Sequence, residues 1–169
     1  NSFKEFCKKN KFEINYSQIK VIVELDKFLN SKKTIFNSIF KKNNKLCFYL
    51  VGSVGVGKTM ILNFVYDQLN IKKLRLHFNE FMINFHDFKH NNAKKEGNLV
   101  SLFVKNLKKK YELIYLDEFQ VTNIVDAMIL GKLFEEIFLE NIKIIITTNI
   151  KLDDLYKDGL QREQFLPFI

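Results

Sequence analysis

Glycine, arginine and cysteine are scarce in this sequence, which has six, two and two of them in 169 residues. Cys7 and Cys47 lie far apart without metal-ligand spacing, which argues against a zinc site and favours a reducing compartment. No apolar run approaches the roughly 18 residues of a membrane span, and residues 1–10 lack the apolar core of a signal peptide. With 47% hydrophobic residues, the chain is expected to fold as a soluble, cytoplasmic protein with a large core.

The net charge of +8 is unevenly distributed along the chain. Residues 1–45 hold 11 Lys and four acidic residues, giving +7, whereas residues 46–169 hold 16 basic and 15 acidic residues, giving +1. We therefore divide the chain into a basic N-terminal arm, 1–45, and a core, 46–169. The arm could contact nucleic acid, anionic lipid or an acidic protein. Compositional drift explains it at least as well, because 25 of the 27 basic residues are Lys.

Half of the glycines lie within six residues, in the stretch that begins at Gly52. It reads G-x-x-x-x-G-K-T, the pattern of a P-loop that wraps its backbone around phosphates. In such a loop the backbone amides from about Val54 to Thr59 point at the α- and β-phosphates. Lys58 reaches the β- and γ-phosphates and the Thr59 hydroxyl binds Mg²⁺. A nucleoside triphosphate and Mg²⁺ are therefore the expected cofactors.

The flanks of this loop have the context that the motif requires. An apolar run of strand length, Leu46–Val51, precedes it, and Thr59–Leu69 has apolar residues at helical spacing. A glycine-rich turn that arose by chance would not be expected to have both the strand before it and the helix after it. The residues predicted to hold the nucleotide are Gly52, Ser53, Val54, Gly55, Val56, Gly57, Lys58, Thr59 and Met60.

Strand and helix patterns alternate along the whole chain. Strands are predicted at 46–51, 72–78, 113–116 and 142–148, and helices at 16–30, 59–69, 79–88, 99–109 and 124–139, with a polar loop at 89–98. This alternation predicts an α/β fold with a parallel sheet between helical layers, the three-layer fold of P-loop NTPases. Ligands bind such sheets at the carboxyl ends of the strands.

Two carboxylates, Asp117 and Glu118, follow an apolar strand 59 residues after Lys58. An acidic residue there holds Mg²⁺, and a second one can orient and deprotonate the attacking water. The other interpretation is a strand that simply ends in solvated charges. One predicted strand lies between the P-loop and Asp117, so we expect the carboxylate strand not to be adjacent to the P-loop strand.

Two polar residues nearer the C-terminus complete the candidate site. Asn149 ends the next strand, where its amide could hold the lytic water or the γ-phosphate, although Asn is also common in ordinary turns. Arg162 is one of only two arginines, and a guanidinium fixes phosphate charge in a way that lysine does not. The other arginine, Arg75, is interpreted as a surface or structural residue. His77 and His86 lack the carboxylate or cysteine partners of a metal site.

Several segments resemble the AFG-like, or ZapE, family of ATPases, which is similar to AAA+ proteins. The segments are LDEFQVTNIVDAMILGKLFEEIF (116–138), TTN (147–149), LYKDGLQREQFLPFI (155–169), the P-loop with its trailing Met, and HF-x-x-F-M-x-x-x-H (77–86). The resemblance implies a Walker A pair in Lys58 and Thr59 and a Walker B pair in Asp117 and Glu118. It also implies that Asn149 is sensor 1. Arg162 would be a finger acting on a neighbouring subunit, since members are expected to form homo-oligomeric rings with an AAA+-like core.

By the same resemblance, the last core strand and a helical lid would follow Ile169. The expected function is Mg²⁺-dependent ATP hydrolysis with Lys58, Glu118, Asn149 and Arg162 as catalytic residues. In bacteria the partner would be a protein of the division machinery near the inner membrane, and eukaryotic members are mitochondrial. Two alternatives stay open: a helicase-loader-like ATPase acting at DNA, and a nucleotide-gated binding module.

Overall fold

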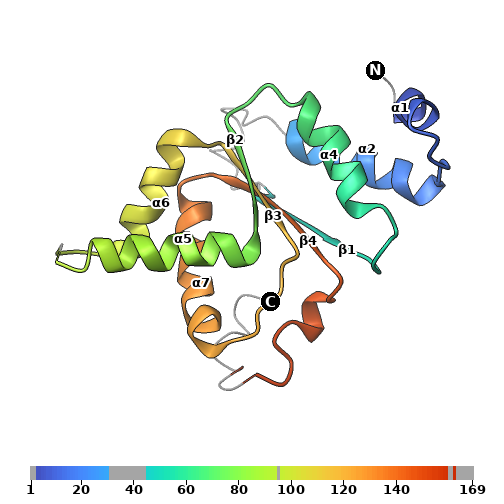
Figure 1. Ribbon diagram of the computed structural model, residues 1–169. Coiled ribbons are helices and arrows are strands. Elements are labelled where there is room, and N and C mark those ends of the chain that lie inside the picture. Colours follow the sequence, from blue (N-terminus) through green and yellow to red (C-terminus); the bar gives the residue numbers. More distant parts are fainter. Residues whose placement is uncertain (1–2, 31–44, 95, 160–161, 163–169) are drawn as a thin grey trace, which may run out of the picture.

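The computed structural model describes residues 3–30, 45–94, 96–159 and 162 (Figure 1). Residues 31–44 of the N-terminal arm lie outside the described residues, as do residues 160–161 and 163–169 of the segment 155–169 that carries part of the resemblance. The elements follow in the order α1 (Phe3–Lys9), α2 (Tyr16–Asn30), β1 (Cys47–Val51), α4 (Lys58–Gln68), β2 (Lys73–His77), α5 (Phe78–Asn91), α6 (Leu99–Lys110), β3 (Leu113–Asp117), α7 (Ile124–Leu139), β4 (Lys143–Thr148) and the 3₁₀ turn η1 (Leu152–Asp154).

The four strands form one parallel sheet in the order β1-β4-β3-β2. β4 lies between β1 and β3: its Ile146 is in register with Tyr49 of β1 on one side and with Leu116 of β3 on the other. The strand that ends at Asp117 is therefore separated from the P-loop strand by β4. This confirms both the predicted parallel α/β architecture and the predicted non-adjacency of the two strands.

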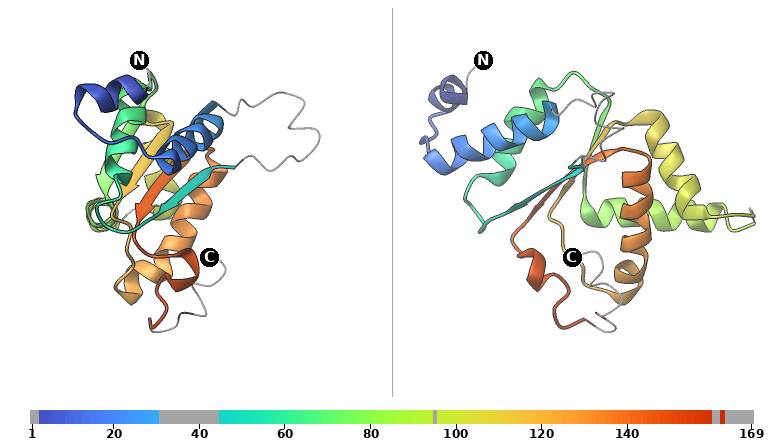
Figure 2. Two further views of the ribbon diagram at one scale, coloured as in Figure 1. Left: turned by 90° about the vertical axis from the view of Figure 1, so that its right-hand side faces the viewer. Right: turned by 180° about the vertical axis from the view of Figure 1, so that it is seen from behind.

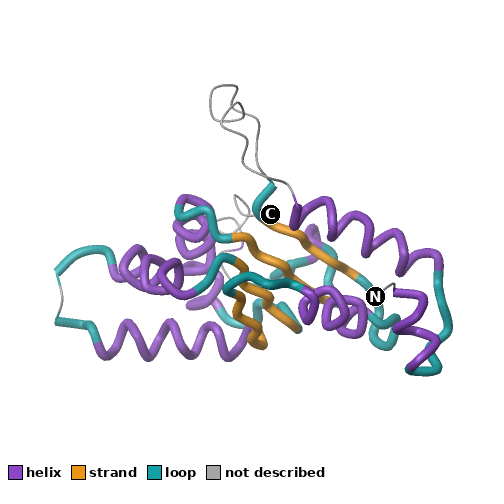
Figure 3. The backbone as a smooth tube through the Cα atoms, turned by 90° about the horizontal axis from the view of Figure 1, so that it is seen from above, coloured by secondary structure: helices purple, strands orange, loops and turns teal. Residues whose placement is uncertain are grey.

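Helices cover both faces of the sheet (Figures 1 and 3). Successive side chains of a strand point to opposite faces, and β3 uses this alternation to bury both of its sides. Ile114 and Leu116 pack in the cluster with α5, α6 and α7, whereas Leu113 and Tyr115 pack with α2 and α4. The uninterrupted apolar run of β3 thus follows from a strand enclosed between two helical layers.

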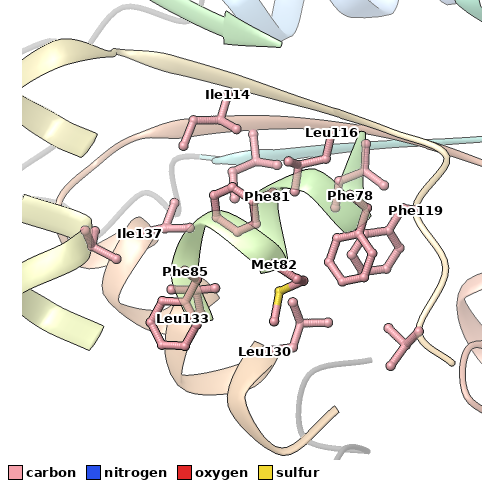
Figure 4. Close-up of a cluster of buried hydrophobic side chains, with 14 of the residues drawn as sticks. Phe78, Phe81, Met82, Phe85, Ile114, Leu116, Phe119, Leu130, Leu133 and Ile137 are labelled. Atoms are coloured by element: carbon pink, nitrogen blue, oxygen red, sulfur yellow. The ribbon is translucent and has the colours of Figure 1, made fainter. Parts of the chain in front are cut away.

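The larger cluster is rich in phenylalanine from α5 (Figure 4). Phe78, Phe81, Met82 and Phe85 recur at the spacing of one helix face, and all four are buried. Phe78 packs edge-on against Phe119, with ring centroids 4.6 Å apart. This contact fixes the chain just after Asp117 and Glu118 to the core.

The helix predicted at 79–88 is longer in the structure, where it runs from Phe78 to Asn91. β2 ends at His77, and α5 begins at the next residue, Phe78, which is buried and is the first member of the apolar face of the helix. At the other end Asn92 donates from its backbone N–H and from Nδ2 to the carbonyl of Phe88, which closes the final turn. The predicted polar loop is correspondingly shorter.

The N-terminal arm packs on the core through two helices (Figure 2). The predicted helix at 16–30 is confirmed as α2, and its Leu25 and Phe28 are buried against the sheet. α1, which the sequence does not predict, buries Phe3 and Cys7 against Ile61 of α4. None of the helices in the described part of the chain is long and apolar enough to cross a membrane.

Candidate nucleotide-binding site

The glycine-rich loop connects β1 directly to α4, and two of its glycines hold the turn. Gly55 and Gly57 have φ of +81° and +84°, a left-handed conformation that costs residues with a Cβ atom. Gly57 is the N-cap of α4 and provides no side-chain hydrogen bond. The first amides of a helix have no intrahelical acceptor, so at this end they can donate to a bound anion.

Lys58 is the first residue of α4, and its side chain folds back over the loop. Its Nζ donates to the carbonyl oxygens of Gly52 at 2.6 Å and of Ser53 at 2.9 Å. A lysine ammonium has three N–H donors, so it can keep both bonds and still donate to a phosphate oxygen. Gly52 and Ser53 therefore position the lysine from outside the cavity.

A cavity of about 440 Å³ lies over this loop at the carboxyl ends of the strands, within the size range of ligand pockets. It is lined by Val54, Gly55, Gly57, Lys58, Thr59, Met60, Asp117, Glu118, Gln120, Thr147, Thr148 and Asn149. Three separate segments thus converge on one site, as expected for a parallel sheet. Of the residues predicted to hold the nucleotide, Gly52, Ser53 and Val56 are not part of this lining.

Asp117 is held by several hydrogen bonds at the wall of the cavity, and only 8% of its side chain is exposed. Its Oδ1 accepts hydrogen bonds from the hydroxyl of Thr147 and, at 3.1 Å, from the backbone N–H of Glu118. Its Oδ2 accepts from Nη2 of Arg75 at 3.0 Å. Burial raises the pKa of Asp117, but the hydrogen bonds outweigh burial and lower this pKa below its ordinary value. The group is therefore a carboxylate at neutral pH.

Glu118 lies beside it in a different environment. Its side chain is 79% exposed, and its Oε2 is 3.6 Å from Nδ1 of His77 at the end of β2. The backbone of Glu118 has φ of +54°, a left-handed conformation that is uncommon for residues other than glycine. Such a conformation costs free energy and persists only where the surrounding structure holds it in place. This turn places two adjacent carboxylates in one cavity, one buried and one accessible to water.

The donor set fits Mg²⁺ and a nucleotide. The structure's described residues contain no group of three or more His, Cys, Asp or Glu that could hold a metal alone. A divalent ion here would take oxygens from Thr59 and Asp117 and complete its shell with phosphate and water, as Mg²⁺ usually does. The amides and Lys58 supply the positive surface that the phosphates need.

Asn149 and Arg162 occupy different positions relative to the cavity. Asn149 follows β4, is exposed and lines the cavity. Arg162 does not line it, and its Nη2 donates to the carbonyl of Asp153 at 2.7 Å. The structure thus brings Asn149 together with Lys58, Asp117 and Glu118, and leaves Arg162 outside.

Arg75, which the sequence suggested to be a surface or structural residue, has a partly exposed side chain whose guanidinium forms an ion pair with Asp117. The sequence analysis missed Thr147 and Gln18. Gln18 of α2 donates from Nε2 to the carbonyl of Val56 in the loop at 3.3 Å. Gln18 lies 38 positions from Val56 in the sequence, and Arg75 lies 42 positions from Asp117, so no local sequence pattern indicates either contact.

A phosphate-binding loop, a buried carboxylate on a non-adjacent strand and a polar residue on the strand between them define a P-loop NTPase with an AAA+-like core. Domain III of the replication initiation protein DnaA from Thermotoga maritima has this fold in common, with a TM-score of 0.58 and 16% identity over 92% of this chain and 62% of that one.

The family is defined by sequence. The sequence model of the AFG1-like ATPase family matches residues 9–169, and the chain belongs to this family. It is 37% identical over 122 residues to the cell division protein ZapE of Escherichia coli, covering 72% of this chain and 32% of ZapE. It is 38% identical over 133 residues to lactation elevated protein 1 homolog B of Danio rerio, covering 72% and 26%. The match thus spans about a third or less of each of these relatives.

Proposed function

We propose that this chain is the nucleotide-hydrolysing part of a Mg²⁺-dependent ATPase. One observation carries the proposal: Lys58, Asp117, Glu118 and Asn149, from three segments, line the same cavity of about 440 Å³. A cavity lined by both an anion-binding loop and two carboxylates suits a metal-bound triphosphate.

Each side chain has a role that follows from its environment. The loop amides and Lys58 bind and orient the phosphates, and Thr59 and Asp117 hold Mg²⁺, which neutralises charge on the phosphate oxygens. Glu118 is exposed to the cavity and suited to accept a proton from the attacking water. Asn149 orients that water or the terminal phosphate by hydrogen bonding, without adding charge.

We further propose that the protein works as a homo-oligomeric ring on a protein partner. Arg162 lies outside the cavity of its own chain, which suits a finger that reaches the site of a neighbouring subunit. Since ZapE is named a cell division protein, a bacterial protein of this kind would act on the division machinery, in the cytoplasm at the inner membrane. A eukaryotic one would act in mitochondria.

The experiment is single-turnover hydrolysis by the full-length protein carrying Glu118→Gln. We expect the variant to bind ATP and Mg²⁺ like the parent, because Asp117 and the loop are untouched, and to lose about 10² to 10⁴ in rate, the usual contribution of a general base. Glu135→Gln, an exposed carboxylate of α7, is the matched control and keeps the parent rate. A Glu118→Gln protein with parental turnover would show that Glu118 is only a solvated strand end.

A further inference from the structure

Arg75 connects β2 with α4 and with β3, the strand that ends at Asp117. It lies in β2, and its guanidinium donates from Nη1 to Oδ1 of Asn63 in α4 at 2.5 Å and from Nη2 to Oδ2 of Asp117 at 3.0 Å. Its Cζ is 5.0 Å from the ring centroid of Tyr115. The register of β2 and β3 explains the convergence, because Arg75 is opposite Tyr115 and His77 is opposite Asp117. All four side chains therefore belong to one face of the sheet.

The two oxygens of Asp117 are held by different kinds of donor. Oδ1 takes two neutral donors, the Thr147 hydroxyl and the Glu118 amide, and these already fix the orientation of the carboxylate. Oδ2 takes the guanidinium. Arg75 is therefore not needed to orient Asp117, and what it adds is a full positive charge at the second oxygen.

We propose that Arg75 acts through Asp117: it shares the carboxylate with the divalent metal and sets the affinity of the site for that metal. The inference rests on the proposed function, in which Asp117 holds Mg²⁺. A fixed guanidinium and Mg²⁺ on the same carboxylate repel each other, so Arg75 weakens metal binding. The same charge keeps the buried carboxylate paired when the metal leaves, which avoids an isolated buried charge.

The magnitude follows from the charges and their separation. A monovalent and a divalent cation about 6 Å apart repel each other, even at the dielectric constant of water, enough to change metal affinity about tenfold. The Arg75 side chain is partly open to solvent, with 34% of it exposed, so we use the repulsion calculated at the dielectric constant of water. A purely structural Arg75, which only ties β2 to α4 through Asn63, would leave metal affinity unchanged.

The test is equilibrium binding of a fluorescent ADP analogue to the full-length protein, first in excess EDTA and then over a Mg²⁺ titration. For Arg75→Gln we expect nucleotide affinity in EDTA within about twofold of the parent and a Mg²⁺ half-saturation concentration about tenfold lower. Asn63→Ala, which removes the contact with α4 and keeps the charge, has the parental half-saturation. Circular dichroism checks that each variant is folded.

Arg75→Lys provides a second measurement if the glutamine variant does not fold. Its charge is retained on a flexible stem without the planar fork and is held less firmly at Oδ2 of Asp117, so its Mg²⁺ half-saturation concentration should be lower than that of the parent. Unchanged or weaker Mg²⁺ binding in either Arg75 variant overturns the inference and leaves the proposed function intact. A parent protein that binds no nucleotide, or whose nucleotide binding ignores Mg²⁺, overturns both.

Discussion

Thr147→Val tests the account of the buried carboxylate through protein stability. Thr147 is 1% exposed, and its hydroxyl donates to Oδ1 of Asp117. Valine has nearly the same shape and no donor. Asp117 keeps its hydrogen bonds from Arg75 and from the Glu118 amide, so the substitution removes one donor without leaving the carboxylate unpaired.

The expected loss follows from the charge of the acceptor. A hydrogen bond to a charged group contributes about 1.5 to 3 kcal/mol, so we expect the free energy of unfolding to fall by about 2 kcal/mol at pH 7. The pKa of Asp117 should rise toward its ordinary value, because a donor to its charged form is lost. The folded pKa is lowered, so the stabilisation is present above the unfolded value of about 3.9 and disappears as pH falls through the folded pKa. The cost of the substitution should therefore shrink in that acidic range.

Urea denaturation followed by circular dichroism measures the effect. Thr147→Ser is the matched control, because it keeps the donor and loses one buried methyl group, at a cost of about 0.8 kcal/mol. The reasoning is refuted if the valine variant is as stable as the parent, or if the serine variant is the less stable of the two.

Two further predictions concern the loop and the proposed ring of subunits. Gly57→Ala should weaken ATP binding and stability more than Gly55→Ala in calorimetric titrations and urea denaturation. Both positions need positive φ, at about 1–2 kcal/mol of strain. A Cβ at Gly57 would also lie 2.9 Å from Nε2 of Gln18, so the end of that side chain would have to move and give up its hydrogen bond to the Val56 carbonyl, whereas a Cβ at Gly55 would meet no atom within 4 Å. Equal effects of the two substitutions would contradict this. Arg162→Ala subunits should bind ATP, hydrolyse it poorly, and regain partial turnover when mixed with Lys58→Ala subunits. Proven subunit exchange without recovery would exclude the trans role.

The order of elements and the position of the loop could be predicted because their signals are local. The glycine spacing after an apolar strand marks the P-loop, and the number of strands before Asp117 indicates that its strand is not adjacent to β1. α1 was missed, since its seven residues are too few to show a clear period. Boundaries such as the end of α5 depend on local contacts of one residue, Asn92, whose backbone N–H and side chain both bond to the carbonyl of Phe88.

The electrostatics of the site could not be predicted from local patterns. Arg75 and Thr147 reach Asp117 from the two strands that flank β3, so their role appears only once the sheet order is known. With that order in hand, the pairing of Arg75 with Tyr115 puts it on the same face as Asp117. Gln18 is harder to find, because a helix of the arm can pack on the core in many ways.

The most direct test of the central claim is the affinity of the full-length protein for ATP, measured in the presence of Mg²⁺ for the parent and for Lys58→Ala. We expect Lys58→Ala to keep the fold and to lose nucleotide binding, because Nζ of Lys58 contacts loop carbonyls and the cavity and not the hydrophobic core. Lys105→Ala, which removes an exposed lysine of α6, should bind ATP like the parent. If Lys58→Ala binds ATP as tightly as the parent, the loop is not the phosphate site and the account is wrong.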